Sequence, residues 1–257
     1  MIVVDKLCYQ SKLRYVDPME KFSFSVLTLV FCIASRSIIM GCLVLLMNSL
    51  LIVKAGGISA KRYRGLMMIP LAFLILSTLA LIVNFSRTPL DAFALDIGKW
   101  YITGSFAGLR RGIQLIVTAM AAVSCLYFLS LNTTMTDIID VCGRLHCPKL
   151  FTELMLLVYR YIFVLLDIAY SISTAQNARL GNKDHATALR SFASLLQVLF
   201  IRSMKRANAI YDAMESRGYD GDIKVLSESR PKSRKNILLI SLTEAVLLAA
   251  TIYIRVF

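Results

Sequence analysis

The sequence has few of the residues on which enzyme chemistry usually depends: among 257 residues it contains two histidines and one tryptophan. It contains no HExxH, CxxC or GxGxxG motif. The glycine-rich stretch GGISAKRYRG lacks the spacing of a phosphate-binding loop. We therefore expect a protein that is not an enzyme and holds no cofactor. If it serves active transport, another subunit must hydrolyse the ATP.

Acidic residues are also scarce, with 16 Asp and Glu against 29 Lys and Arg, which gives a net charge of +13. The basic residues do not alternate with aromatic residues on a soluble face, so binding to nucleic acid is not expected. The excess instead fits the bias of membrane proteins toward positively charged cytoplasmic segments. The N-terminus also lacks the pattern of a cleavable signal peptide.

Long uncharged stretches dominate the sequence, of which 57% is hydrophobic. A membrane helix needs about 20 such residues. The candidate stretches are residues 22–35, 38–53, 66–86, 113–136 and 237–254, of which the last carries one charged residue, Glu244. Lys21 and Arg36 border the first and would have to reach the membrane interface. The sequence thus predicts an all-α integral membrane protein with about five transmembrane helices, leaving open whether residues 149–170 form an additional one.

The basic segments define a topology. Residues 1–21, 54–64 and 222–236 are all rich in Lys and Arg, whereas the connection 87–109 is of mixed charge. We therefore place the N-terminus in the cytoplasm and the C-terminus outside. Three regions follow: residues 1–136 with four membrane spans, 137–221 with cytoplasmic helices, and 222–257 with a linker and the last span.

Two long helical patterns, residues 153–181 and 188–221, begin apolar, become polar and end at Arg179 and Arg217. Gly181 and Gly218 follow, where a residue with positive φ often closes a helix. A cation in the last turn is favourable by about 0.3–1 kcal/mol, which alone would explain one arginine. Two helices that end alike favour docking of both tips into an acidic or carbonyl-lined groove of another protein.

Charged residues also recur within the first of these patterns. Glu153, Arg160 and Asp167 are spaced by seven residues and so share one helix face. Charges in such apolar surroundings must pair or face water. We regard them as weaker candidates for stabilising this arm, with ion pairing in the protein interior as the alternative.

One group of residues is typical of metal ligands. Cys142 and His146 are four residues apart on an expected amphipathic helix, and Cys147 follows. A metal site needs three or four ligands with supporting groups, and no acidic partner is evident. We therefore prefer a buried cysteine on an amphipathic helix and assign no metal ligand. The six cysteines are scattered and do not indicate a disulfide framework.

These motifs resemble a known family. The chain resembles the transmembrane coupling (T) component of energy-coupling factor (ECF) transporters, specifically the cobalt type called CbiQ. The resemblance covers nearly the whole chain and includes Asp5, Tyr9, Leu13-Arg14, Pro18 and Lys21, and the blocks ELMLLVYRYIFVLL, AQNARLG and AMESRGYDG. The two Ala-Arg-Gly motifs of the family correspond to Ala178-Arg179-Leu180 and Ser216-Arg217-Gly218. The chain departs from the triplets at Leu180 and Ser216, but keeps both arginines.

The resemblance implies two long coupling helices that cross near the inner face of a bacterial or archaeal plasma membrane. The tips, formed by Ala178, Arg179, Ser216, Arg217 and Gly218, would bind two ABC-type ATPase subunits. The membrane part would hold a capture subunit for cobalt, used in cobalamin biosynthesis, and a small accessory membrane subunit. Nickel or a vitamin remains an alternative substrate. A membrane enzyme would need a convergent set of His, Asp and Glu, and a stand-alone transporter would show inverted repeats; we find neither pattern.

Overall fold

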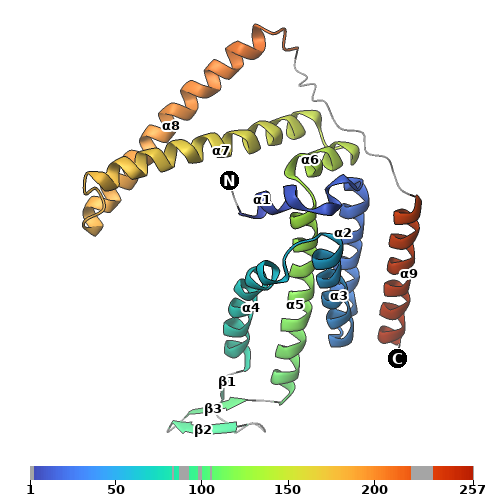
Figure 1. Ribbon diagram of the computed structural model, residues 1–257. Helices are drawn as coiled ribbons and strands as arrows, with labels where there is room; N and C mark the ends of the chain where they lie inside the picture. The colour runs from blue at the N-terminus through green and yellow to red at the C-terminus, as the bar shows by residue number, and fades with distance from the viewer. Residues whose placement is uncertain are drawn as a thin grey trace. The chain divides into compact units, whose positions relative to one another are not determined.

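The computed structural model describes residues 3–82, 84–86, 93–97, 100–104, 106–220 and 234–256. The chain divides into two compact units, one of residues 139–228 and one of residues 2–138 and 229–257. We call the second unit the membrane bundle. The other unit contains two long helices that form a hairpin, which we call the arm hairpin. Helices make up most of the described residues (Figure 1).

The membrane bundle is built from helices of different lengths. Their bounds are α1 Val3–Gln10, the 3₁₀ turn η1 Lys12–Tyr15, α2 Pro18–Ser35, α3 Ile38–Leu50 with the π turn η2 Leu51–Ala55, α4 Ala60–Ile82, α5 Phe106–Asn132 and α9 Arg234–Val256. Helix α6, Met135–Arg144, follows α5 and leads toward the hairpin. Figure 1 shows α9 running parallel to α2.

Local sequence fixes both ends of α2. At its start the Asp17 side chain accepts a hydrogen bond from the Met19 N–H, and Pro18 occupies the first turn, where its missing N–H costs nothing. At its end Arg36 adopts a left-handed conformation with φ of 46°, which turns the chain into α3. The tight turn expected between the first two apolar stretches is therefore made by Arg36.

The core of the bundle surrounds α5, which packs against α1, α2, α3 and α4. Phe24 and Phe128 make an edge-to-face contact with ring centroids 5.2 Å apart. A second apolar cluster contains Val44, Cys125 and Leu247, which brings α9 into the same core. The buried side chains of α9 therefore account for its place beside α2.

Polar residues tie the helices together inside the bundle. Ser11 donates to Oδ1 of Asn132, and the ammonium group of Lys21 donates to the carbonyl oxygens of Leu13 and Asn132 at 3.2 and 2.9 Å. Lys21 is only 3% exposed. The expectation that Lys21 reaches outward to the membrane interface is wrong, because these carbonyl groups solvate its charge within the protein.

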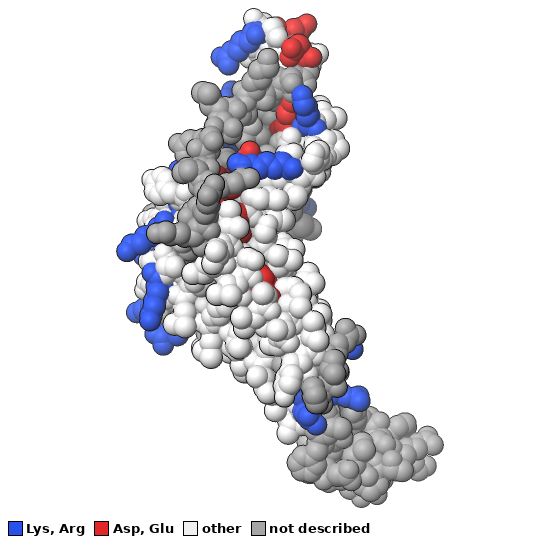
Figure 2. Space-filling model, turned by 90° about the vertical axis from the view of Figure 1, so that its right-hand side faces the viewer, with Lys and Arg blue, Asp and Glu red and all other residues white. Residues whose placement is uncertain are grey.

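Five helices in the described residues are long and apolar enough to cross a membrane: Pro18–Ser35, Ile38–Ala55, Ala60–Leu79, Gly108–Asn132 and Lys149–Ala178. A shorter apolar helix spans Ile237–Tyr253. In Figure 2 the lower middle of the surface is mostly uncharged, with a few acidic side chains visible and Lys and Arg side chains along one edge, which suits a lipid-facing surface. The prediction of an all-α integral membrane protein is confirmed. The last of these five helices, Lys149–Ala178, is the first of the two long helical patterns, for which the sequence had left a membrane span open.

A small sheet interrupts the helical pattern between α4 and α5. Its strands are β1 Asn84–Ser86, β2 Phe93–Ile97 and β3 Trp100–Gly104, antiparallel and in the order β1-β3-β2. The sequence analysis described this region only as a connection of mixed charge. Its aromatic and β-branched residues, such as Phe93, Ile97 and Trp100, are typical of strands.

Candidate functional site: the arm hairpin and its arginine tips

The arm hairpin consists of α7, Lys149–Ala178, and α8, His185–Glu215. At 1.5 Å per residue, each helix is about 45 Å long. The two helices approach each other at the connection 179–184 and diverge away from it (Figure 1). A helical arm of this length can carry a movement from one of its ends to the other.

The first tip closes α7 with a complete Schellman motif. The Gly181 N–H donates to the Gln176 carbonyl at 2.8 Å, and the Leu180 N–H donates to the Asn177 carbonyl at 3.1 Å. The residue in the left-handed conformation is Leu180, with φ of 57°. The prediction that Gly181 takes the positive φ is therefore wrong, because the turn places its left-handed position one residue earlier.

Gly181 is nevertheless suited to its position. A Cβ atom there would lie 2.8 Å from the Gln176 carbonyl oxygen and 2.8 Å from the Ser191 hydroxyl. Ser191 donates to the Gly181 carbonyl, and the Gln176 amide donates to the Ser191 carbonyl, both at 2.8 Å. Glycine thus allows α7 and α8 to approach closely, and these bonds fasten the hairpin at its closed end.

The second tip closes α8 in the same way. The Tyr219 N–H donates to the Met214 carbonyl at 3.0 Å, and the Gly218 N–H donates to the Glu215 carbonyl at 2.9 Å. Gly218 has φ of 74°, as predicted. Arg217 thus immediately precedes the left-handed residue, as Arg179 does in the first tip.

The five predicted tip residues, Ala178, Arg179, Ser216, Arg217 and Gly218, are all exposed. Neither arginine forms an ion pair with another residue of the part of the chain that the structure describes. Each guanidinium group lies at the carbonyl end of a long helix, where a positive charge is favoured. The two tips therefore present the same type of charge in the same local backbone geometry.

The other predicted residues of the first arm have different surroundings. Glu153 is buried and accepts a hydrogen bond of 3.4 Å from the Tyr219 hydroxyl, whereas Arg160 and Asp167 are exposed. Seven residues of helix separate Glu153 from Arg160, and Arg160 from Asp167, by about 10 Å each. The structure therefore does not bring these three side chains together. The sequence analysis missed Tyr219. No local pattern indicates this contact, because it joins residues 66 apart on different helices of the hairpin.

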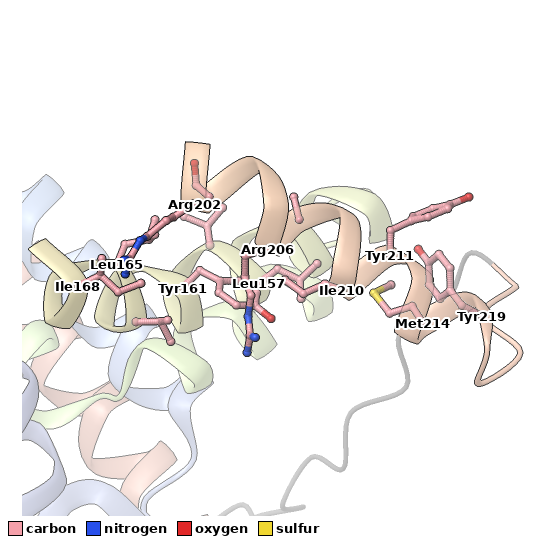
Figure 3. Close-up of a pocket in the computed structure, with 14 residues that line it drawn as sticks. Leu157, Tyr161, Leu165, Ile168, Arg202, Arg206, Ile210, Tyr211, Met214 and Tyr219 are labelled. Carbon is pink, nitrogen blue, oxygen red and sulfur yellow. The ribbon is translucent and has the colours of Figure 1, made fainter. Parts of the chain in front are cut away.

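An apolar groove of about 660 Å³ lies between the two helices (Figure 3). Its wall on α7 is formed by Leu157, Val158, Tyr161, Val164, Leu165 and Ile168, and the rest by Arg202, Ser203, Arg206, Ala207, Ile210, Tyr211, Met214 and Tyr219. The groove exists because the helices diverge from their closed end, so these apolar side chains do not meet.

The cysteines near the start of the hairpin do not complete a metal site. The Cys147 N–H donates to the Cys142 carbonyl at 3.1 Å, and His146 between them has φ of 64°. Burial raises the pKa of the Cys142 thiol, and the neighbouring Cys147 raises it further. No group of three or more His, Cys, Asp or Glu residues lies together within the described ranges.

Comparison with known proteins places these features in one family. The family model described as CbiQ, cobalt transport protein, matches residues 10–228. The chain belongs to the CbiQ family. The predicted resemblance is thereby confirmed for the region that holds most of the membrane bundle and the whole arm hairpin.

Individual relatives agree with this assignment. The CbiQ-family chain is 30% identical over 246 residues to an uncharacterized protein of Methanocaldococcus jannaschii, covering 96% of this chain and 91% of the relative. It is 29% identical over 223 residues to the cobalt transport protein CbiQ of Salmonella typhimurium, covering 86% and 99%. It is 31% identical over 138 residues to the ECF transporter transmembrane protein EcfT of Staphylococcus aureus, covering 49% and 52%. The chain is thus a multi-pass transmembrane component of the ECF type.

Proposed function

We propose that this chain is the energy-coupling subunit of an ECF-type importer for cobalt ions. In this proposal, movement of ATPase subunits reaches the tips of α7 and α8 and is carried along the arms to a membrane subunit that captures the substrate. The observation that supports it best is the equivalence of the two tips, each an exposed arginine directly before a left-handed helix end.

The partners follow from the chemistry of the chain. It has no phosphate-binding motif, so ATP hydrolysis is assigned to two ABC-type ATPases that bind the tips. The described residues contain no metal-binding group, so the cobalt ion is assigned to a separate capture subunit, assisted by a small accessory membrane subunit. The relative named CbiQ in Salmonella typhimurium supports cobalt as the substrate.

The proposed orientation rests on the positive-inside rule. The segment before α2 is basic and the segment before α9 is polar and rich in Lys and Arg, which supports a cytoplasmic location for both segments. In this proposal the N-terminus is inside and the C-terminus outside. The arm tips then face the cytoplasm of a bacterial or archaeal cell, where ATP is available.

Each tip arginine is suited to bind a partner that offers carboxylate or carbonyl oxygens. The guanidinium group is planar, permanently charged and able to donate two parallel hydrogen bonds. Ala178 and Ser216 precede the arginines and are small enough to let a partner surface approach the last turn. Gly218 keeps the second turn closed without strain.

The proposed stabilisation of the arms depends mainly on Glu153. Its contact with Tyr219 joins the beginning of α7 to the residue that follows the second tip. Movement of that tip would therefore displace Tyr219 and, through this hydrogen bond, the beginning of α7. Arg160 and Asp167 lie farther along α7 and remain weaker candidates for this role.

The coupling role can be tested with Arg179→Ala/Arg217→Ala in the assembled transporter. We expect cobalt uptake to fall at least tenfold and tagged protein to lose its ATPase subunits, because each substitution removes a charged anchor. The control is Lys61→Ala/Arg64→Ala, which removes two exposed cations from α4 of the membrane bundle. Normal uptake and normal ATPase retention in the tip variant would refute the coupling role.

Substrate identity needs a separate measurement. Uptake of radioactive cobalt, radioactive nickel and a labelled vitamin should be compared in cells that express the complete transporter. We expect uptake of cobalt, and the tip variant should abolish it. Transport of nickel or the vitamin instead would correct the substrate while leaving the coupling mechanism in place.

A further inference from the structure

The groove between α7 and α8 has the size and lining of a ligand site. Its volume of about 660 Å³ lies within the range of about 300–1,000 Å³ typical of small-molecule pockets. Aliphatic and aromatic side chains such as Leu165, Ile168 and Ile210 form most of its wall. An occupant must therefore offer a long apolar part.

Two arginines add positive charge to this mostly apolar groove. Arg202 and Arg206 both line it, and Figure 3 shows both side chains extending from α8 toward α7. Neither forms an ion pair with an acidic residue in the described part of the chain, and the lining contains no Asp or Glu. Both side chains are exposed, so a negatively charged group of an occupant could reach and pair with them.

The spacing of the two arginines favours a single compact anion. They are four residues apart on one helix, so their Cβ atoms are about 6 Å apart on neighbouring turns. Because both side chains are long and flexible, their guanidinium groups can reach the oxygens of one phosphate group. An isolated apolar ligand would leave both charges without a counterion.

The membrane supplies a molecule with both properties. Helix α7 is long and apolar enough to cross a membrane, and its apolar 18-residue window contains no buried residue. Large apolar side chains such as Leu154, Val158 and Ile162 are exposed on it. Anionic phospholipids are also attracted to arginines near the membrane surface, by about 1 kcal/mol for each residue.

We infer that the groove between α7 and α8 binds one anionic phospholipid. Its phosphate group lies between Arg202 and Arg206, and an acyl chain follows the wall formed by Leu157, Tyr161 and Ile210. This inference goes beyond energy coupling and does not depend on it, because the isolated chain contains every residue of the site.

The test is native mass spectrometry of the full chain, purified in detergent and titrated with dioleoyl phosphatidylglycerol or dioleoyl phosphatidylcholine. We expect one phosphatidylglycerol molecule to be retained, with at least tenfold preference over phosphatidylcholine. Each arginine should contribute about fivefold, so Arg202→Gln/Arg206→Gln should weaken binding about 25-fold. A photoreactive phosphatidylglycerol should label peptides of α7 between residues 157 and 168.

Matched variants separate this site from general attraction to basic protein. Arg190→Gln/Lys205→Gln removes the same charge from exposed positions of α8 outside the groove and should leave binding unchanged. Ala207→Trp fills the groove but keeps both arginines, and should abolish retention. Circular dichroism and gel filtration verify that each variant is folded.

The inference would be overturned by equal retention of the two lipids, by equal weakening in the groove and control variants, or by no labelling of α7. Inorganic phosphate added in excess should not displace the lipid, and displacement by phosphate alone would show that the apolar groove contributes nothing. Retention of no lipid by the wild-type chain would also overturn it.

Discussion

The side-chain hydroxyl of Ser11 donates a hydrogen bond of 2.7 Å to Oδ1 of Asn132, although 121 residues separate them in sequence. Asn132 also donates from its amide group to the Phe128 carbonyl at 2.8 Å. The side chain of Asn132 is therefore bonded on both of its polar atoms. This contact attaches the N-terminal segment to the end of α5.

Replacing either partner should destabilise the bundle. Ser11→Ala or Asn132→Ala leaves a buried polar group without its partner, which costs about 1–3 kcal/mol of unfolding free energy. Denaturant unfolding in detergent would measure the loss. The double variant should lose less than the sum of the two losses. Ser130→Ala in the same helix is the control and should change stability by less than about 0.5 kcal/mol. Strict additivity would show that the contact contributes nothing.

Two glycines should respond oppositely to alanine. A Cβ atom at Gly56 would lie 2.6 Å from Asn132 Oδ1 and 2.6 Å from the Ile52 carbonyl oxygen, whereas one at Gly65 would meet nothing within 4 Å. We expect Gly56→Ala to lower the melting temperature, with a loss of about 1–3 kcal/mol. Gly65→Ala, within α4, should gain about 0.5–1 kcal/mol from its lower backbone entropy when unfolded. Equal effects of the two substitutions would contradict this account.

The first tip contains a correctable strain. Leu180 has φ of 57°, a conformation that side chains with a Cβ atom adopt at a cost of about 1–2 kcal/mol. Leu180→Gly restores the Ala-Arg-Gly triplet of the family and removes this strain. We expect a net stabilisation of the end of α7 of about 0.5–1 kcal/mol, less than the full strain energy, because glycine loses more entropy on folding. Hydrogen exchange of the amides at the end of α7 would measure the change. Gly218→Ala is the reciprocal test, and it should loosen the end of α8. Faster exchange in Leu180→Gly would refute the strain.

A buried carboxyl group joins α9 to α2. The Thr28 hydroxyl oxygen lies 2.7 Å from Glu244 Oε1 and 2.7 Å from the Phe24 carbonyl oxygen. The Thr28 hydroxyl has one hydrogen and can donate it to only one of these two oxygens. The side-chain amide of a glutamine at position 244 could instead donate a hydrogen bond to the Thr28 oxygen. Glu244→Gln should therefore alter stability by less than about 1 kcal/mol.

Placing a charge at the same position should be much more costly. Glu244→Lys should lower stability by about 3 kcal/mol, because a charged side chain would be buried among membrane helices. Detergent unfolding followed by circular dichroism measures both variants, and Glu215→Lys on exposed α8 is the control. A lysine variant as stable as the glutamine variant would show that position 244 is not buried in the folded bundle.

The sequence was most informative where its pattern was local. Uncharged stretches indicated the membrane helices because a bilayer imposes a length and excludes charge. The glycine after Arg217 indicated the second turn correctly, because only backbone conformation is involved. The left-handed Leu180 was not predicted, since sequence preference favours glycine and the Schellman turn at the end of α7 places the left-handed position at residue 180.

Contacts between distant residues could not be predicted from these patterns. The burial of Lys21 depends on the Asn132 carbonyl, which is 111 residues away. The bond between Glu153 and Tyr219 likewise requires the hairpin to be folded. The apolar groove depends on the angle at which two amphipathic helices diverge. Helix periodicity indicates the faces of each helix, but it does not specify this angle.

The contact between Thr28 and Glu244 spans 216 residues, nearly the whole chain. Helix α2 is translated long before α9, so the side of α2 that carries Thr28 and Cys32 lacks its neighbour until α9 has been made. Assembly of this part of the bundle therefore depends on a segment translated much later than α2, and a chain truncated before α9 would keep an uncovered surface on α2.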